Sequence, residues 1–326
     1  MKSNLFFLIV FFSLTSCSKE ESSNPETTTD FRQNMRNFVV EISKYSKAIN
    51  PNFNIIPQNG IELVTNDGTV SGQPNTAYLN AIDANGQEDL LYGYENDDQA
   101  TPNVTISYLK GFLNISKSTN KKILVTDYVS TPSKINNSYL ENNNSGYVSF
   151  AANHRELDNI PTIPAQIYRE NNIDVTSMVQ VKNFLYLINP SRFTSKNDFI
   201  NAVNASNYDL IIMDLFFNDG IAFTKSEIDK LKTKANGGKR LVISYVSIGE
   251  AENYRFYWNT SWTTNKPTWL DTVNPDWPGN FKVKYWNQDW QNIIYGNDNS
   301  YIKKIINAGF DGAYLDIIDA FEFYET

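Results

Sequence analysis

The sequence predicts an α/β fold, a (β/α)8 barrel of the TIM type, and three observations support this prediction. From residue 31 onward, short apolar runs alternate with amphipathic helical patterns, as expected for repeated βα units around parallel strands. There are eight such runs, the number of strands that closes a parallel barrel. Most of the runs end in a polar or charged residue, and in a barrel these carboxyl ends form one face.

The expected elements follow in a regular order. Residues 33–49 carry apolar side chains at helical spacing, and Asn50-Pro51 ends that helix. The expected strands cover residues 53–57, 80–83, 122–126, 146–150, 183–188, 208–213, 240–246 and 312–315. The expected helices between them cover residues 107–118, 196–205, 224–235 and 289–308.

An open, doubly wound sheet is the alternative fold, because its strand ends also bind ligands. Neither G-x-G-x-x-G nor G-x-x-x-x-G-K-[ST] occurs in the sequence. The usual nucleotide-binding versions of that fold are therefore excluded.

The first thirty residues predict a lipoprotein signal followed by a tether. Lys2 precedes an apolar run, Leu5 to Leu14, that is too short to span a bilayer. The run leads into Leu14-Thr15-Ser16-Cys17, which resembles a bacterial lipoprotein signal with Cys17 as the lipidated residue; an ordinary secretory peptide is the alternative. We expect a lipid-anchored protein of the cell envelope, at the outer membrane and exposed at the surface. The predicted parts are a signal peptide over 1–17, a disordered tether over 18–30 and a single barrel domain over 31–326.

Charge and rare residues narrow the chemistry. The formal net charge of −8 argues against a nucleic-acid partner and fits a cationic or neutral one. The chain has one cysteine and one histidine and lacks a G-x-S-x-G motif. These counts disfavour a Ser-His-Asp or Cys-His mechanism and a zinc site, and we expect no metal and no cofactor.

Carboxylates remain as the candidate catalytic groups. Glycoside hydrolysis needs two of them, one to protonate the leaving oxygen and one to act as nucleophile or to activate water. Any single acid at a strand end also has a structural explanation at the start of the next helix, so their convergence on one face is the stronger signal. The acids near predicted strand ends are Glu88, Asp89, Asp127, Asp214, Glu250, Glu252, Asp316 and Asp319.

Residues 247–258 form the most distinctive stretch, since they combine two acids, an arginine and several aromatic residues. Arg255 could pair with Glu250 or Glu252 and hold it ionised as a substrate clamp; a structural salt bridge is the alternative. Residues 274–280 and 285–286 predict a long aromatic loop suited to stacking against sugar rings.

Several segments resemble glycoside hydrolase family 114, the endo-α-1,4-polygalactosaminidases and their relatives. The similar segments are NFLYLINP, YDLIIMDLFF, RLVISYVSIGEAENYRFYW, NPDWPGNFKVKYW, GFDGAYLDIIDAFEFYE, NPNFNIIPQNG, GQEDLLYG and ILVTDYV. Their order departs from that of the family, because residues 31–158 resemble its C-terminal half and residues 183–326 its N-terminal half. We therefore expect a circularly permuted barrel, with residues 159–182 joining the halves; a fusion of two half-barrels is the alternative.

The resemblance implies a glycosidase that needs no cofactor and is endo-acting on an amino-sugar polysaccharide such as α-1,4-galactosaminoglycan. It implies Asp316 as nucleophile and Glu88 as acid/base, with Asp319 and Glu250 as their rivals. We expect a monomer that contacts the membrane only through its lipid. A non-catalytic carbohydrate-binding surface lipoprotein on the same barrel is the alternative function. The candidate substrate contacts are Asp214, Tyr245, Glu250, Glu252, Arg255, Trp258, Gln58, Asn59, Asp127 and Asp319.

Overall fold

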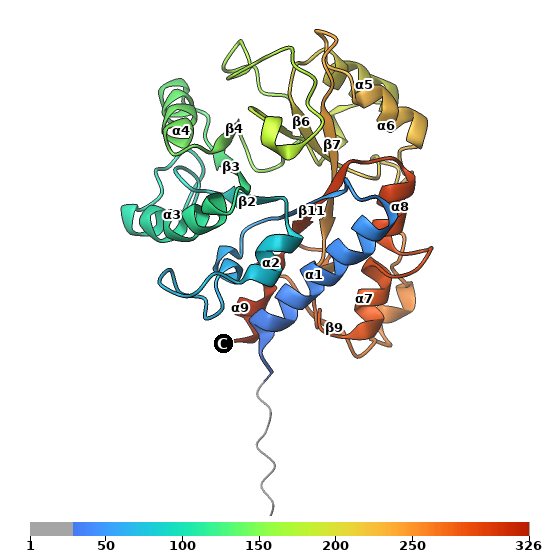
Figure 1. Cartoon of the computed structure of the whole chain (residues 1–326). Helices are drawn as coiled ribbons and strands as arrows, with labels where there is room; N and C mark the ends of the chain where they lie inside the picture. Colours follow the sequence, from blue (N-terminus) through green and yellow to red (C-terminus); the bar gives the residue numbers. More distant parts are fainter. Residues whose placement is uncertain (1–28, 326) are drawn as a thin grey trace, which may run out of the picture. The chain divides into compact units, whose positions relative to one another are not determined.

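The computed structural model describes residues 29–325 (Figure 1). The predicted signal peptide, Cys17 and all but the end of the predicted tether lie outside the described residues. Within residues 29–325, no helix combines the length and the apolar character that a bilayer crossing requires.

Eight parallel strands form two sheets at the centre of the domain. The five-stranded sheet has the order β1 (Asn54–Pro57), β11 (Gly312–Asp316), β7 (Leu241–Ser247), β6 (Leu210–Asp214) and β5 (Leu185–Tyr186). The three-stranded sheet has the order β2 (Ala84–Glu88), β3 (Lys122–Tyr128) and β4 (Val148–Ala152). All the ladders in both sheets are parallel, which confirms the α/β class.

The two sheets meet on one side only. An isolated parallel bridge joins Gln58, just after β1, to Gly86 of β2, and the Asn59 amide donates to the Gly86 carbonyl at 3.0 Å. Between β4 and β5 no ladder forms. The loops after the two strands are joined there by a backbone hydrogen bond from the Asn189 amide to the Leu157 carbonyl at 3.2 Å and by the ion pair of Arg192 with Asp158 at 2.7 Å. The strands therefore do not close the predicted barrel.

Helices surround the strands (Figure 1). Phe38, Val39 and Ile42 of the first helix are buried at the predicted spacing. The helices are α1 (Phe31–Ile49), α2 (Thr76–Ala81), α3 (Asn103–Ser118), α4 (Pro132–Asn144), α5 (Lys196–Asn204), α6 (Lys225–Leu231), α7 (Gln288–Ile294), α8 (Tyr301–Asn307) and α9 (Phe321–Tyr324).

Two predicted elements were misplaced. The strand expected at residues 80–83 begins at Ala84 instead, because helix α2, capped by the Asn75 side chain, extends to Ala81. The strand itself has the sequence ANGQE and contains no β-branched residue, so its composition does not indicate a strand. The single helix expected at residues 289–308 is two helices, since Gly296 between them has a φ of 98° that breaks the helical path.

A small antiparallel sheet stands where the sequence predicted loops. Its order is β8 (Glu250–Glu252), β10 (Asn280–Val283) and β9 (Leu270–Val273). Glu250 lies directly opposite Lys282 in this sheet, and the two side chains pair at 2.6 Å. The aromatic stretch at residues 274–286 therefore belongs in part to a β structure held by an ion pair.

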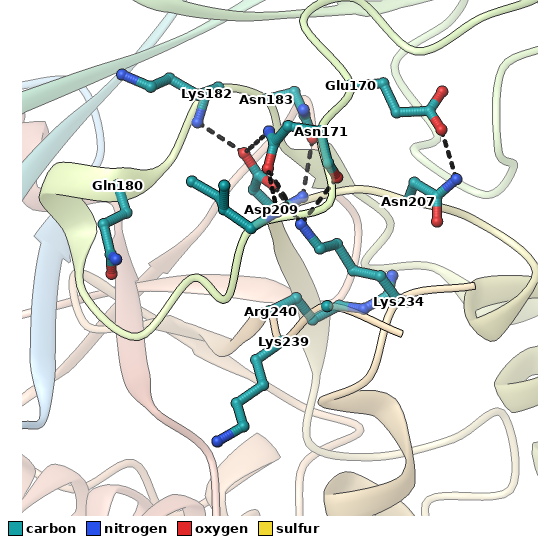
Figure 2. Close-up of polar contacts among 12 residues, drawn as sticks. Glu170, Asn171, Gln180, Lys182, Asn183, Asn207, Asp209, Lys234, Lys239 and Arg240 are labelled. Carbon is teal, nitrogen blue, oxygen red and sulfur yellow. Dashed lines mark hydrogen bonds and ion pairs between the residues drawn. The ribbon is translucent and has the colours of Figure 1, made fainter. Parts of the chain in front are cut away.

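The joining segment is fixed to the amino end of β6 by a buried polar network (Figure 2). Asp209, the residue before β6, pairs with Lys234 at 3.0 Å, and neither side chain is exposed. The second carboxylate oxygen of Asp209 accepts hydrogen bonds from the Asn171 side chain and the Lys182 amide, both at 2.9 Å. This network lies at the end of β6 opposite to Asp214, so it leaves the carboxyl ends of the strands free for a site.

Candidate functional site

Glu88 lies at the carboxyl end of β2 and is held by neutral donors. One of its oxygens accepts hydrogen bonds from the Gln58 amide and from the Asn59 amide at 3.1 Å, and the other accepts from the Tyr128 hydroxyl. The Tyr186 hydroxyl donates to the Gln58 side-chain oxygen at 2.8 Å and fixes that amide in turn. Both carboxylate oxygens of Glu88 therefore have a defined orientation.

Asp316 lies at the carboxyl end of β11. Its Oδ2 accepts from the Tyr245 hydroxyl at 2.6 Å, and its Oδ1 accepts from the Ile317 amide at 2.8 Å. Burial and then the negative charge of Glu88 raise the pKa of Asp316 to about 8, although the Tyr245 hydrogen bond opposes the shift. The charge of Glu88 thus acts directly on Asp316, as in a coupled pair of carboxyls.

Two more carboxyls respond to the same charge. Burial, the charge of Glu322 and the charge of Glu88 raise the pKa of Asp319 to about 7. Burial and the charge of Glu88 also raise the pKa of Asp89 to about 7, against the effect of Arg155. Clusters of acids with perturbed pKa values are typical of functional sites.

A cavity of about 390 Å³ opens beside Glu88. Among its lining residues are aromatic rings and amides, but no lysine, arginine or histidine. Tyr108 lines it and donates its hydroxyl to Glu62 at 2.8 Å. The charged residues that line the cavity are therefore all acidic, although Asp89 also pairs with Arg155 outside the cavity lining. Its acidic residues are Glu62, Glu88, Asp89, Asp319 and Glu322.

A second group of charges surrounds Arg255, on the Tyr245 side of Asp316. The guanidinium pairs with Asp214 at 2.7 Å and with Glu252 at 2.5 Å, so one of the predicted pairings is present. The Tyr254 hydroxyl also donates to Glu252 at 2.6 Å. The charges of Asp214 and Glu252 raise the pKa of Arg255 despite its burial, so it remains a cation.

Three predicted site residues contact protein groups instead of an open surface. Glu250 has no exposure and binds Lys282 and the Asn274 amide. Asp127 is equally buried and accepts from the Leu91 amide at 2.8 Å and the Ser138 hydroxyl at 2.6 Å. Trp258 is half-buried and packs against the rings of Trp262, in a short helical turn, and of Phe281 in β10.

Several residues of the site were not predicted. Tyr128 follows Asp127 on the same strand, and successive side chains of a strand point to opposite faces. Only one of the two could therefore reach Glu88, and it is Tyr128. Glu62 and Glu322 carry no strand-end signal, because they lie in or just after short helical turns that only the tertiary structure brings to the cavity.

Within residues 29–325, no group of three or more His, Cys, Asp or Glu side chains is placed so that it could hold a metal ion. The chemistry available to the arrangement is that of carboxyl groups and of hydroxyl and amide donors.

Comparison with known proteins gives matches that cover only part of the chain. An uncharacterized protein of Methanocaldococcus jannaschii is 45% identical over 132 residues, which are 40% of this chain and 36% of that protein. An uncharacterized protein of Thermotoga maritima is 39% identical over 122 residues, which are 37% of this chain. An uncharacterized protein of Deinococcus radiodurans is 40% identical over 127 residues, which are 39% of this chain. The matches span only 36% and 38% of those two relatives, so little more than a third of each relative's length is covered. Residues 184–325 match the model of glycoside-hydrolase family GH114, and over this part the chain resembles that family.

Proposed function

We propose that the chain is a glycoside hydrolase that cleaves an amino-sugar polysaccharide internally, with Asp316 as nucleophile and Glu88 as acid/base. The coupling of these two half-buried carboxyls, from strands far apart in the sequence, carries the proposal. It is supported by the resemblance of residues 184–325 to family GH114. Glycoside hydrolysis usually requires two carboxyl groups, and the two strand ends supply them.

Burial and the negative charge of Glu88 raise the pKa of Asp316 to about 8, so Asp316 keeps a proton near neutral pH in the absence of a ligand. A cationic sugar beside Asp316 favours the ionised form that a nucleophile needs, and in the proposed reaction the displaced proton passes to Glu88, the acid. Glu88 then protonates the glycosidic oxygen while Asp316 attacks the sugar carbon, and Glu88 accepts a proton from the incoming water in the second step. Gln58, Asn59 and Tyr128 hold Glu88 in place throughout.

The acidic cavity supports a cationic substrate such as a partly deacetylated α-1,4-galactosaminoglycan. It is lined by five carboxyl groups and by no basic side chain. Protonated amines at successive sugars would compensate these charges, whereas an anionic polymer would be repelled.

The fold we propose is a permuted TIM-type barrel that stays open between β4 and β5. β1 and β11 pair in parallel, with Ile56 opposite Tyr314, although they lie near the two ends of the described chain. The family match is confined to residues 184–325. This is expected if residues 31–158 correspond to the family's C-terminal half but precede its N-terminal half in this chain. We also propose attachment to the outer membrane through a lipid on Cys17, which a Cys17→Ser variant recovered in the soluble fraction would support.

Substitution of the two carboxyls tests the function. Glu88→Gln and Asp316→Asn should each lower the rate of galactosaminoglycan cleavage by at least about 100-fold, while Asp229→Asn on the outer helix α6 should leave it unchanged. The measurement is the release of reducing ends from the purified polymer. If both variants cleave at the wild-type rate, the catalytic assignment is wrong. If the wild-type protein binds the polymer without cleaving it, the alternative of a binding lipoprotein stands.

A further inference from the structure

Arg155 ties the loop after β4 to the loop after β2, which follows Glu88. Its guanidinium forms a forked contact with Asp89, at 2.9 Å from Nη2 and 3.3 Å from Nη1. Its Nε donates to Asp97 at 2.7 Å, and Nη2 also donates to the Gly93 carbonyl. One half-buried side chain therefore fixes three points of the loop that begins at Glu88.

The same guanidinium covers the ring of Tyr128. Its Cζ lies 4.2 Å from the ring centroid, within the range of a cation–π contact. Tyr128 is buried and donates its hydroxyl to Glu88. Asp89, the other partner of Arg155, follows Glu88 directly and has a left-handed φ of 58°. Arg155 therefore contacts two neighbours of Glu88, namely Tyr128, which donates to its carboxylate, and Asp89, the next residue of the chain.

Gly93 leaves room for this arrangement. A Cβ at this position would lie 2.1 Å from the Asp89 carboxylate and 3.2 Å from Arg155 Nη2, and its φ of 116° suits only glycine. The loop is thus shaped so that the guanidinium can approach the backbone while it pairs with Asp89.

We propose that Arg155 is a positioning residue for Glu88, which acts by clamping the ring of Tyr128 and the carboxylate of Asp89. This inference rests on the proposed function. It assigns Arg155 no contact with substrate, because its donors are directed to protein groups.

Substitution of Arg155 in the full-length protein tests the proposal. Arg155→Met should lower kcat on galactosaminoglycan by roughly 10- to 100-fold and change KM little, because it misplaces the acid without removing a substrate contact. Arg155→Lys keeps the charge but lacks the flat fork, so it should recover only part of kcat. Arg192→Met, which removes the nearby arginine that pairs with Asp158 at 2.7 Å, is the matched control and should keep the wild-type kcat.

A double-mutant cycle separates positioning from a purely structural role. Tyr128→Phe removes the donor to Glu88, so Arg155→Met should cost much less in that background than in the wild-type protein. If the two losses multiply fully, or if Arg155→Lys has the wild-type kcat, the proposal is wrong.

A titration without substrate keeps this test apart from that of the proposed function. The carboxyl carbon of Asp316 is followed by ¹³C NMR. Because the charge of Glu88 raises the pKa of Asp316, a displaced Glu88 should shift this titration in Arg155→Met, whereas Arg192→Met should leave it unchanged. If the wild-type protein cleaves no polymer, the function fails and this titration alone decides the role of Arg155. An unchanged titration in Arg155→Met would overturn the proposal.

Discussion

At the scale of single residues, the site depends on carboxyls whose charges interact. Asp89, Asp316 and Asp319 all have raised pKa values because they are buried and close to other acids, and Glu88 acts on each of them. Such a cluster lowers the stability of the folded protein at neutral pH, as sites built for chemistry often do.

The pH dependence of cleavage should show this coupling. The pair needs one proton to act, and the pKa of Asp316 is raised to about 8. We expect kcat/KM to fall as the pH rises through about 8, because the last proton of the pair is then lost and no acid remains. The measurement is the rate of polymer cleavage between pH 5 and 10 at constant ionic strength. An alkaline limb that begins only above pH 10 would contradict it.

Asp316→Asn should make the protein more stable at alkaline pH while it lowers the rate of cleavage. The pKa of Asp316 is about 8 in the folded protein against an ordinary 3.8, so between these values the unfolded chain loses a proton that the folded protein keeps. Stability of the wild-type protein therefore falls as the pH rises through this window, and asparagine removes that loss. The difference in melting temperature should grow from about zero near pH 4 to roughly 5 °C near pH 8. A difference that is constant across this range would show that Asp316 does not titrate as proposed.

At the scale of elements, the joining segment is held by a charge pair rather than by a helix or a ladder. Asp209 and Lys234 have no exposed side-chain surface, and Asn171 and Lys182 of the segment bind the same carboxylate (Figure 2). A buried pair of this kind stabilises little compared with an apolar pair, but the loss of one partner leaves a buried charge uncompensated.

Asp209→Asn should therefore lower the free energy of unfolding by about 3 to 5 kcal/mol. Asp229→Asn breaks an ion pair of similar length, 2.6 Å to Lys225, whose side chains are 47% and 66% exposed. It should cost less than about 1 kcal/mol, because solvent screens the pair. Urea unfolding followed by circular dichroism compares the two, and equal losses would mean that burial of the Asp209 pair has no energetic consequence.

At the scale of the whole domain, the two ends of the described chain lie together. The Phe31 and Tyr324 rings stack at 5.6 Å, and Arg32 pairs with Glu325 at 3.0 Å. α1 and α9 accordingly begin and end at neighbouring points of the fold (Figure 1). Glu322 of α9 also lines the acidic cavity, so this junction adjoins the proposed site.

A rearranged chain should fold, because the strand pairings do not depend on where the chain is opened. We would join residue 325 to residue 31 by a short glycine-serine linker and open the chain between the exposed residues Ala165 and Gln166. This variant should keep the circular dichroism spectrum and the cleavage rate of the wild-type protein. An otherwise identical chain opened between the buried Val125 and Thr126 of β3 should not fold. Failure of both chains would contradict the permuted order.

The sequence by itself determined the α/β class, most strands and the pair of acids proposed for catalysis. Apolar runs such as residues 208–213 and 240–246 need burial on both faces, and that need is local to each run. Gln58 and Asn59 could also be named as site residues from their place after β1, although they bind Glu88 in this structure.

Only the tertiary structure decided which neighbours each acid has. Asp127 and Glu250 lie at predicted strand ends, as Glu88 does. In the structure, however, Asp127 accepts a hydrogen bond from the loop after β2, and Glu250 pairs with Lys282. The tertiary structure also decided that the barrel stays open at the two-residue strand β5. It likewise decided that one acidic cavity contains Glu62, Glu88 and Asp319. The physical reason is that burial and electrostatic coupling depend on residues far apart in the chain, whereas strand and helix patterns depend on residues a few positions apart.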